Sequence, residues 1–372
     1  MRIICLFAFA VAVSFFLSST PASARFFPNI TSIPPWLNAT HGAWDSFRNL
    51  SGCHPGEKAD GLSKLKNYLK HFGYINSSSN FTDDFDSDLK TAIETYQKNF
   101  NLNVTGDLDP ETVQQIVRPR CGVADIVNGS TTMNSGKTTQ SSNATHIHTV
   151  SHYTFFPGKP RWPQYNRDLT YAFQPENELT DVVKGVFTRA FSRWSAVTAL
   201  TFTQTDSLAD ADLKIGFFVG DHGDGEPFDG LLGTLAHAFS PTSGRLHLDG
   251  DENWVVSSDI TEATETSAVD LESVAVHEIG HLLGLGHSSV ENAIMYPTIP
   301  SRTRKVELAS DDILGIQELY GTNPSYNGST STTTPSSENE GDTVYGSSAQ
   351  ISGSLWGFKA AMAAGFGLLL VL

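Results

Sequence analysis

Cysteine is scarce in this sequence, which has only Cys5, Cys53 and Cys121 among its 372 residues. Cys5 lies in an N-terminal segment that we expect to be removed. The two cysteines that remain cannot staple a small secreted scaffold, so a disulfide-dense fold is excluded. A disulfide bond between Cys53 and Cys121 is one role that the sequence leaves open for this pair.

Basic residues are few as well. The chain has 24 Lys and Arg against 40 Asp and Glu, which gives a formal net charge of −16 at pH 7. Nucleic acids and anionic membrane surfaces repel a chain this acidic, which argues against these partners and favours bound metal ions. The length is sufficient for two modest domains with tails.

Long apolar runs are confined to the two ends of the chain. Residues 1–24 contain one early arginine, an apolar run from Ile3 to Leu17 and a small-residue cleavage site, which together predict a secretory signal peptide. Secretion agrees with the Asn-x-Ser/Thr sequons, none of which lies within Ser151–Tyr320. The predicted glycosylation sites are Asn29, Asn38, Asn49, Asn76, Asn80, Asn103, Asn128, Asn143 and Asn327.

The second apolar run ends the chain. Residues 349–372 combine small residues, a short spacer and the stretch Ala360–Leu372, which predicts a GPI-anchor signal that is removed and leaves the protein on the outer leaflet of the plasma membrane. A single-pass helix and an uncleaved tail are the alternatives. The stretch is too short to span a core of about 30 Å at about 1.5 Å per residue. Residues 323–348 are Ser/Thr-rich and polar, which predicts a disordered stalk.

Reactive side chains are gathered between His277 and His287, in the sequence HEIGHLLGLGH. Residues four apart share one face of a helix, so His277 and His281 can bind one metal ion. Gly284 and Gly286 can end the helix and turn the chain back, which brings His287 as a third ligand. This spacing predicts a zinc site whose fourth position is open.

Glu278 follows the first histidine but lies about 100° around the helix from it, so it faces the open position instead of joining the ligands. Zinc held by three neutral imidazoles lowers the pKa of a bound water to about 7 and polarises a carbonyl. Glu278 is then suited to be the general base of peptide-bond hydrolysis. The alternative is a structural zinc site, which uses four protein ligands and has no use for an adjacent carboxylate.

A methionine turn, Ile294-Met295-Tyr296-Pro297, follows the third histidine. The combined pattern resembles the metzincins, and Ser288 directly after the third histidine is similar to the matrixin branch, the matrix metalloproteinases. The resemblance implies a zinc metalloendopeptidase acting on extracellular proteins or peptides, with Met295 beneath the zinc ligands. It also implies a metzincin domain (α+β or α/β) in which long helices pack on a twisted, mostly parallel sheet.

Residues 151–322 fit such a domain. The apolar patterns at Leu169–Phe173, Leu200–Thr205 and Leu213–Val219 predict strands, and the helical period between Val183 and Trp194 predicts a crossover helix. Strand, helix and strand in this order predict an α/β sheet.

Further metal ligands follow from the resemblance. Taken singly, the histidines of this region would be surface or hydrogen-bonded core residues. Together they match the closed structural zinc site of matrixins, formed here by His222, Asp224, His237 and His247. We therefore expect two Zn²⁺ per catalytic domain.

Calcium is the other expected ion. By resemblance, at least one Ca²⁺ is bound by Asp229, Asp249, Glu252 and the backbone carbonyl of Gly230. A solvated acidic loop is the alternative for these carboxylates. Asp212 matches one ligand of a second calcium site.

Residues 25–125 predict a small three-helix domain. Apolar residues recur with a helical period in 59–73 and 86–100, and Asp109-Pro110 can cap a third short helix. The pattern resembles the peptidoglycan-binding-like prodomain of matrixins. A free-standing binding module is the alternative.

This domain leads into Pro119-Arg120-Cys121-Gly122-Val123-Ala124-Asp125, which resembles the matrixin cysteine switch with Ala124 in place of proline. The resemblance implies that Cys121 binds the catalytic zinc in a latent form, so that the prodomain is the enzyme's own inhibitor. It also implies that Arg120 pairs with Asp125. Residues 126–150 are rich in Ser, Thr, Asn and Gly, which predicts a flexible linker open to activating cleavage.

The polar stalk follows Gly321 where many matrixins have a hemopexin-like domain, so the resemblance is to the plant type that lacks one. Two other classes of function remain as alternatives. A catalytically silent zinc-holding module has no need of Glu278, and a wall- or glycan-binding module leaves the zinc residues unexplained. Substrate preference is expected from a pocket with Pro297–Ile299 as its wall and Ser273 on its floor.

Overall fold

The computed structural model of the chain describes residues 42–76, 80–133, 152–257 and 259–328. By its internal contacts the chain divides into residues 1–330 and 331–372. The predicted signal peptide 1–24 and anchor signal 349–372 lie outside the described residues. Within the described ranges, no helix is both long enough and apolar enough to cross a membrane.

The N-terminal domain contains the three helices that the periodicity predicts. A 3₁₀ turn, η2 (Asp45–Leu50), precedes α1 (Leu62–His71), α2 (Ser87–Asn99) and α3 (Pro110–Ile116). Asp86 caps α2 by accepting the backbone N–H of Leu89, and Asp109 caps α3 through Thr112. Proline at the first position of α3 has no N–H to leave unsatisfied. These caps explain why α2 and α3 begin where they do.

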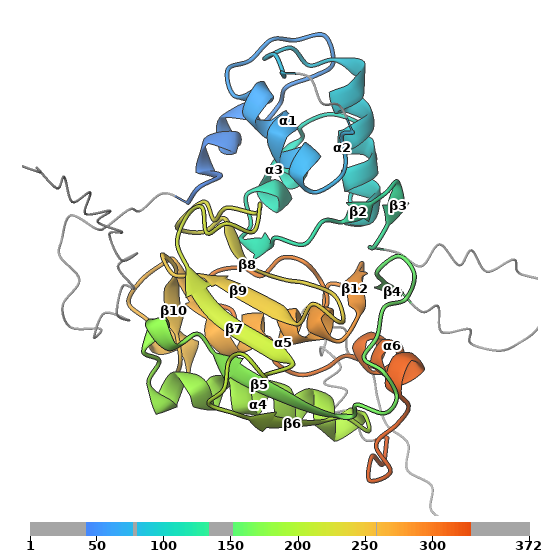
Figure 1. Ribbon diagram of the computed structural model, residues 1–372. Helices are drawn as coiled ribbons and strands as arrows, with labels where there is room; N and C mark the ends of the chain where they lie inside the picture. Colours follow the sequence, from blue (N-terminus) through green and yellow to red (C-terminus); the bar gives the residue numbers. More distant parts are fainter. Residues whose placement is uncertain (1–41, 77–79, 134–151, 258, 329–372) are drawn as a thin grey trace, which may run out of the picture. The chain divides into compact units, whose positions relative to one another are not determined.

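The second domain is built on a six-stranded sheet with the order β1-β8-β9-β7-β5-β6 (Figure 1). Its strands are β1 (Arg120–Cys121), β5 (Asp168–Phe173), β6 (Thr201–Gln204), β7 (Leu213–Phe218), β8 (Thr234–Ala238) and β9 (Arg245–Asp249). Only the pair β8 and β9 is antiparallel. The prediction of a mostly parallel sheet is confirmed, and its edge strand β1 comes from the segment that carries Cys121.

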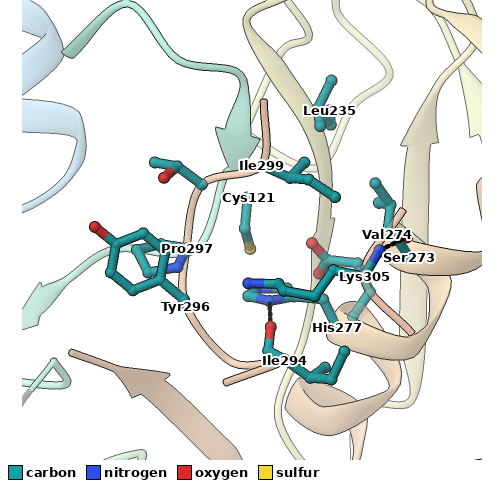
Figure 2. Close-up of a pocket in the computed structure, with 12 residues that line it drawn as sticks. Cys121, Leu235, Ser273, Val274, His277, Ile294, Tyr296, Pro297, Ile299 and Lys305 are labelled. Carbon is teal, nitrogen blue, oxygen red and sulfur yellow. Dashed lines mark hydrogen bonds between the residues drawn. The ribbon is translucent and has the colours of Figure 1, made fainter. Parts of the chain in front are cut away.

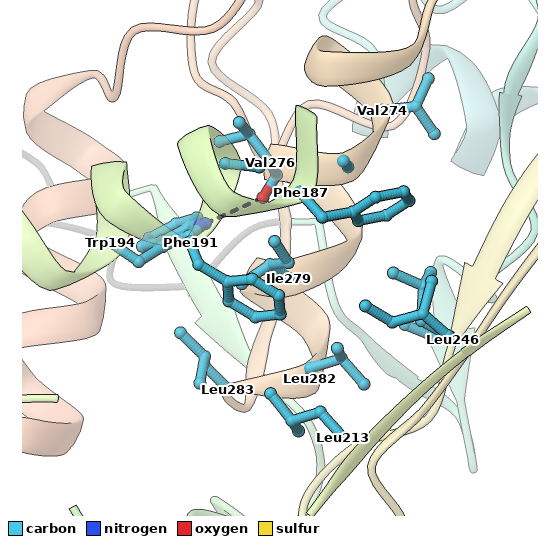
Figure 3. Packing of buried hydrophobic residues seen from close by; sticks show 14 of the residues in the cluster. Phe187, Phe191, Trp194, Leu213, Leu246, Val274, Val276, Ile279, Leu282 and Leu283 are labelled. Atoms are coloured by element: carbon cyan, nitrogen blue, oxygen red, sulfur yellow. Dashed lines mark hydrogen bonds between the residues drawn. The ribbon is translucent and has the colours of Figure 1, made fainter. Parts of the chain in front are cut away.

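The helices α4 (Asp181–Val197) and α5 (Leu271–Leu282) pack against each other and against the sheet. Figure 3 shows Phe187, Phe191 and Trp194 of α4 facing apolar side chains of α5. The indole N–H of Trp194 donates to the carbonyl of Val276 at 2.9 Å, which satisfies its polar atom inside the core. Burial of each large apolar side chain contributes about 1.5–3 kcal/mol, so this core holds α5 firmly in place.

Shorter elements complete the domain. They are β2 (Ile126–Val127), β3 (Ser130–Thr131), β4 (Tyr153–Phe155), η3 (Pro175–Asn177), β10 (Asn253–Val255), η4 (Ile260–Glu262), β11 (Ala268–Asp270), β12 (Leu285–Ser288) and α6 (Ser310–Tyr320). The strand β12 pairs with β4 in an antiparallel two-stranded sheet.

The prediction that residues 126–150 form a flexible linker is wrong for their first part. Strands β2 and β3 form a hairpin whose turn has Asn128 at φ 51° and Gly129 at φ 76°. Met133 is fully buried in the core of the three-helix domain. The segment has no apolar period because contacts with other segments, not a core of its own, hold it. Residues 134–150 lie outside the described part of the chain.

The beginning of the predicted stalk is also ordered. The side-chain amide of Asn323 donates to the carbonyl of Ser195 at 2.8 Å, and its backbone N–H donates to Val197. Tyr326 packs against the core of the second domain. The disordered stalk predicted for 323–348 therefore does not begin at residue 323, and residues 329–348 lie outside the described ranges.

Candidate metal centres and active site

The helix α5 carries two of the predicted zinc ligands and the predicted base. Its N-cap is Asp270, whose carboxylate accepts the backbone N–H of Ser273 at 2.8 Å and so satisfies a donor that the first turn leaves free. Every residue of α5 is buried. This surrounding core fixes the directions of His277, Glu278 and His281.

The Nδ1 atoms of the two helical histidines bind backbone carbonyls. Nδ1 of His277 lies 2.7 Å from the carbonyl oxygen of Ile294, and Nδ1 of His281 lies 2.8 Å from that of Leu285. A carbonyl oxygen only accepts, so Nδ1 carries the proton in both neutral rings. The lone pair is thereby left on Nε2, the atom that points to the proposed metal position.

The third histidine reaches the site through β12. Gly284 has a φ of 104°, which glycine adopts without strain, and it turns the chain after α5. A Cβ at Gly286 would lie 2.4 Å from Oγ1 of Thr154, so only glycine fits between β12 and β4. His287 then arrives with its Nδ1 atom 2.9 Å from Oδ1 of Asp125.

The three Nε2 atoms are buried and have no hydrogen-bond partner among the described residues. Together with Sγ of Cys121 they form a group whose members all lie within 4.8 Å of one another. Burial lowers the pKa of His277 and of His281 well below its usual range, so both rings are neutral, as metal ligands must be. Four convergent donors, three of which would otherwise be orphaned, fit a tetrahedral zinc ion.

Glu278 lies beside this group without joining it. Its side chain is fully buried and lines the same pocket as His277 and Cys121. Burial raises the pKa of Glu278 to about 8, and the neighbouring Cys121 side chain lowers it slightly against that trend. A carboxylate that has lost its hydration is a stronger base than one in water, which agrees with the predicted role.

Met295 packs directly on the backbone of α5. A Cβ at Gly280 would lie 2.3 Å from Sδ of Met295, so the glycine between the two helical ligands leaves space for the methionine. The carboxylate of Asp312 accepts the backbone N–H groups of Ile294 and Met295 at 2.8 and 3.0 Å. The methionine turn is therefore fixed from both sides.

Cys121 is held between two segments of the second domain. Its N–H donates to the carbonyl of Pro297 at 2.9 Å, and the N–H of Gly122 donates to Ala236 in β8 at 2.8 Å. Cys53 and Cys121 are both free thiols in the structure. The alternative of a disulfide between them is therefore not formed.

Arg120 and Asp125 form the ion pair that the resemblance implies, and both side chains are fully buried. Two parallel bonds of 2.9 and 2.6 Å join the guanidinium to the carboxylate, and the guanidinium stacks 3.6 Å from the ring centroid of Phe72. Burial alone would raise the pKa of Asp125, but Arg120 and His287 hold it well below its usual range. The pair forms although Ala124 replaces the proline of the family pattern.

The second predicted zinc set also converges. Nε2 of His222, Nε2 of His237 and Nδ1 of His247 lie 2.9, 2.8 and 2.7 Å from Oδ2 of Asp224. Burial, with the neighbouring His237, lowers the pKa of His247 to about 4. Three imidazoles and one ionised carboxylate around one point fit a closed, four-ligand zinc site.

The predicted calcium ligands lie in one buried acidic region. Burial raises the pKa of Asp249 to about 7, and burial with the charge of Asp249 raises that of Glu252 well above its usual range. Oε2 of Glu252 is buried without a partner. Asp249 also accepts the N–H of Gly230 at 3.1 Å, and Asp229 contributes to the repulsion. A hard cation bound to these oxygens would remove that repulsion, so the residues fit calcium.

Asp212, proposed for a second calcium site, has other partners. Its carboxylate accepts the N–H and the hydroxyl of Thr170 at 2.8 and 2.9 Å and the amide of Asn166 at 3.1 Å. These bonds tie the start of β7 to β5. The metal-ligand groups found among the described residues do not include Asp212.

Six of the nine predicted glycosylation sites fall on described residues, and all six are exposed. They are Asn49, Asn76, Asn80, Asn103, Asn128 and Asn327. Asn29, Asn38 and Asn143 lie outside the described part of the chain. Exposure leaves the six available to glycosylation, which stays a prediction.

Sequence reasoning missed two features of the site. It gave Asp125 one partner, Arg120, but the structure adds His287, far away in the sequence. It also named Pro297–Ile299 and Ser273 as the pocket, and these do line it, but Lys305 lines it as well. Neither the contact of Asp125 with His287 nor the position of Lys305 has a signal in the composition, because each depends on contacts between segments that are distant in the sequence.

Comparison with known proteins points to the same family. The matrixin model matches residues 161–321, and a model of a putative peptidoglycan binding domain matches residues 58–116. Metalloendoproteinase 2-MMP of Arabidopsis thaliana is 61% identical over 88% of this chain and 88% of its own length. Metalloendoproteinase 1 of Glycine max is 50% identical over 85% of this chain and 96% of its own length. Matrix metalloproteinase-20 of Homo sapiens is 38% identical over 62% of this chain and 41% of its own length.

Proposed function

The chain belongs to the matrixin family of zinc metalloendopeptidases, and we propose that it is a secreted endopeptidase made as a latent zymogen, with Glu278 as its general base. One observation carries the proposal. Three neutral imidazoles, the carboxylate of Glu278 and the thiol of Cys121 meet at one buried place. The first four groups supply the chemistry of hydrolysis, and the thiol supplies a means to block it.

The chemistry divides between the metal and the chain. His277, His281 and His287 would hold the zinc ion, which when bound would polarise the substrate carbonyl and lower the pKa of a water molecule to about 7. Glu278 takes the proton of the attacking water and gives it to the nitrogen of the leaving amine, so the peptide bond breaks without a covalent enzyme intermediate. The dry surroundings of Glu278 favour the first of these transfers, because they strengthen the carboxylate as a base.

The remaining residues keep these groups in position. The carbonyls of Ile294 and Leu285 hold the rings of His277 and His281, and Met295 packs under α5. Such partners fix the tautomer and orientation of ligating histidines, and losing one typically costs about 10–100-fold in metal affinity or activity. We propose the second zinc, at His222, and at least one calcium ion, at Asp249, as structural ions.

Latency is proposed from the position of Cys121. Its sulfur lies within 4.8 Å of the three Nε2 atoms. We propose that it occupies the position at which the attacking water would otherwise bind. The backbone bonds of Cys121 and Gly122, and the buried pair of Arg120 and Asp125, hold the segment there. The prodomain would thus act as an intramolecular inhibitor until cleavage or loss of the thiol opens the site.

The proposed substrates are extracellular proteins or peptides, and the proposed location is the outer face of the plasma membrane. Support for the location is in the sequence alone: the signal peptide of residues 1–24 and the GPI-anchor signal of residues 349–372, both outside the described residues. Release of the protein from membranes by a GPI-specific phospholipase would support the anchor. A protein that stays on the membrane while the same phospholipase releases a GPI-anchored control protein would refute it.

Substitution Glu278→Gln tests the proposed mechanism. The variant keeps the shape of the side chain but cannot accept a proton, so we expect two bound zinc ions and a fall in peptide hydrolysis by about 10²–10⁴-fold. Zinc content and hydrolysis are measured on the activated wild type and the variant side by side. A variant with normal zinc content and near-normal activity would show that Glu278 is not the base. A wild type with no activity on any peptide would favour the silent zinc-holding module.

A further inference from the structure

One loop leads from the acidic region of the second domain into β8, and we call its residues 229–233 the acidic-site loop. Asp229, its first residue, is one of the proposed calcium ligands. The N–H of Leu232 donates to Oε1 of Glu252, another proposed ligand, at 2.8 Å. Oε2 of Glu252 is buried and has no hydrogen-bond partner among the described residues. The shape of the loop and the position of the oxygens that fit calcium therefore depend on each other.

The acidic-site loop is also in contact with the prodomain, through residues 42–44, which we call the strap. The N–H of Ala43 donates to the carbonyl of Leu231 at 2.9 Å. The indole of Trp44 makes a hydrogen bond to the carboxylate of Asp229. A carboxylate has about four lone-pair sites, so a bond from an indole leaves oxygen sites for a cation. The strap therefore orients a proposed calcium ligand and still leaves it able to bind the ion.

Leu232, in the acidic-site loop, has a φ of 56°, a conformation that residues other than glycine rarely adopt. A residue in such a conformation persists only where its surroundings hold it. One contact that holds Leu232 is its bond to Glu252 in the acidic region. Another is the backbone of the strap, because a Cβ at Gly42 would lie 2.9 Å from the Cβ of Leu232. The acidic region and the strap therefore stabilise the same strained loop.

The end of the acidic-site loop binds the segment that carries Cys121. The N–H of Arg120 donates to the carbonyl of Gly233 at 3.0 Å, and Arg120 pairs with Thr234 at the start of β8. Cys121 is the next residue, and Figure 2 shows its sulfur pointing toward His277. A change in the shape of the loop therefore acts on the residue directly before the proposed inhibitory thiol.

We propose that the acidic-site loop couples calcium binding to latency, so that a bound calcium ion holds the prodomain more tightly and the docked strap increases the affinity for calcium. Both partners stabilise one conformation of the loop, and the partner that binds second has less of the loop left to order. The coupling is reciprocal, so each partner raises the affinity of the other by the same factor. The proposal rests on the latency proposed above, because the release of Cys121 is the event that it controls.

Two substitutions separate the strap from the general stability of the prodomain. Trp44→Phe removes the indole N–H but keeps a ring against Tyr68 and Phe72, whose centroids lie 4.9 and 6.2 Å from that of Trp44. Phe47→Leu is the matched control, because Phe47 packs on the same Tyr68 at 5.8 Å but belongs to η2, after the strap. The melting temperature and the zinc content of both variants are compared with those of the wild type first.

The test is the rate at which a maleimide labels Cys121 in the unprocessed full chain, with and without calcium. All proteins in this comparison carry Glu278→Gln so that none processes itself, and peptide mass spectrometry separates Cys121 from Cys53. Zinc is measured in every sample, so that a loss of zinc is not taken for an effect of calcium. With Trp44 intact, we expect saturating calcium to slow the labelling by about 10–100-fold. Trp44→Phe should reduce this factor by about 3–10-fold, the effect of one lost hydrogen bond, and Phe47→Leu should keep it.

Calcium titrations give the reciprocal measurement. The Kd for calcium is measured for the unprocessed wild type and for the activated wild type from which the prodomain has been removed. Removal should weaken calcium binding by the same factor by which calcium slows the labelling of Cys121. Peptide hydrolysis by the activated wild type is assayed separately, so that the coupling and the peptidase function are tested independently.

Several outcomes would overturn the proposal. Labelling of Cys121 at one rate, whether or not calcium is bound, would show that the loop does not couple the two sites. Faster labelling with calcium would show that the ion and the strap exclude each other. Equal losses in Trp44→Phe and Phe47→Leu would assign the effect to the stability of the prodomain, and a chain that binds no calcium would refute the calcium site and the coupling together. A wild type that shows the coupling but hydrolyses no peptide after activation would support the coupling and refute the peptidase function alone.

Discussion

Asp125, in the segment that carries Cys121, bonds to the third zinc ligand: its Oδ1 atom lies 2.9 Å from Nδ1 of His287. The same oxygen lies 2.6 Å from the guanidinium of Arg120. Since Asp125 is ionised, Nδ1 of His287 is the donor, and its Nε2 lone pair is left for a metal. The prodomain therefore touches the site at two points, through the sulfur of Cys121 and through the imidazole of His287.

Substitution Asp125→Asn should weaken latency. It removes the charge that compensates Arg120, and breaking a buried ion pair costs about 3–5 kcal/mol. We expect the unprocessed variant to hydrolyse peptide at least 10-fold faster than the unprocessed wild type, measured as an initial rate. Asp88→Asn, at an exposed position on α2, is the control. If both variants stay as silent as the wild type, the buried pair does not hold the prodomain in place.

Cys121→Ser should yield a precursor that is active and trims its own linker between residues 134 and 150. A neutral hydroxyl binds zinc far less well than a thiolate, so water can take the open position. For the wild type, capture of the thiol by a mercurial should produce a large rise in activity before any backbone cleavage, seen by gel and by assay of the same samples. An unprocessed wild type as active as the processed enzyme would rule out inhibition by Cys121.

His237→Ala should lower both stability and metal content. The substitution removes one of four ligands around Asp224, and ligand sets of this kind contribute folding energy through the bound ion. We expect metal analysis to fall from two zinc ions to one and the free energy of unfolding to fall by several kcal/mol, on the order of the loss of a structural ion. His54→Ala, at an exposed position, is the control and should keep two zinc ions. One zinc ion in the wild type would refute the second site.

The ion pairs of Glu272 should make part of the free energy of unfolding depend on pH. Burial alone would raise its pKa, but Arg304, Arg189 and Arg193 lower it from 4.5 to about 2. A carboxyl with a lowered pKa in the folded state stabilises the fold above pH 4.5, and that contribution is lost as the pH falls toward 2. After allowance for solvent screening, we expect about 1–3 kcal/mol near pH 6.

The measurement is urea unfolding of the wild type and Glu272→Gln at several pH values between 6 and 3. The difference between the two proteins should be largest at pH 6 and should shrink as the pH falls. Glu307→Gln is the matched control, because Glu307 pairs with the same Arg193 at 2.7 Å but is 81% exposed. It should change stability by about 0–1 kcal/mol at every pH. A difference for Glu272→Gln that does not depend on pH would contradict the assigned pKa.

Local patterns in the sequence were sufficient for the helices and for most of the zinc ligands. The apolar period and the caps Asp86 and Asp109 predict α2 and α3, and the spacing of His277 and His281 predicts a shared helical face, as the structure has it. These features depend on residues within one or two turns of each other. Their physical cause is therefore contained in a short stretch of chain.

Features that depend on distant contacts were not predictable in this way. The hairpin after Asp125 is polar, and its composition predicts a linker. Met133 at its end is nevertheless buried in the core of the three-helix domain. Lys305 lies outside every motif, and only the fold of the chain brings it to Ser273 and Ala293. In both cases the decisive interactions join residues far apart in sequence, which neither composition nor periodicity reports.

The parallel pairing of β1 with β8 has a consequence for the enzyme after activation. Among the described residues, β1 is the edge of the six-stranded sheet, so its departure turns β8 into an edge whose N–H and C=O groups lack a strand partner. Such an edge is a template for any extended peptide, including the unfolded chain of another copy. Removing the prodomain would therefore expose an edge strand that can pair with the backbone of a substrate and can also pair with another copy and cause aggregation. A peptide bound along β8 would occupy this edge and so protect the enzyme against aggregation.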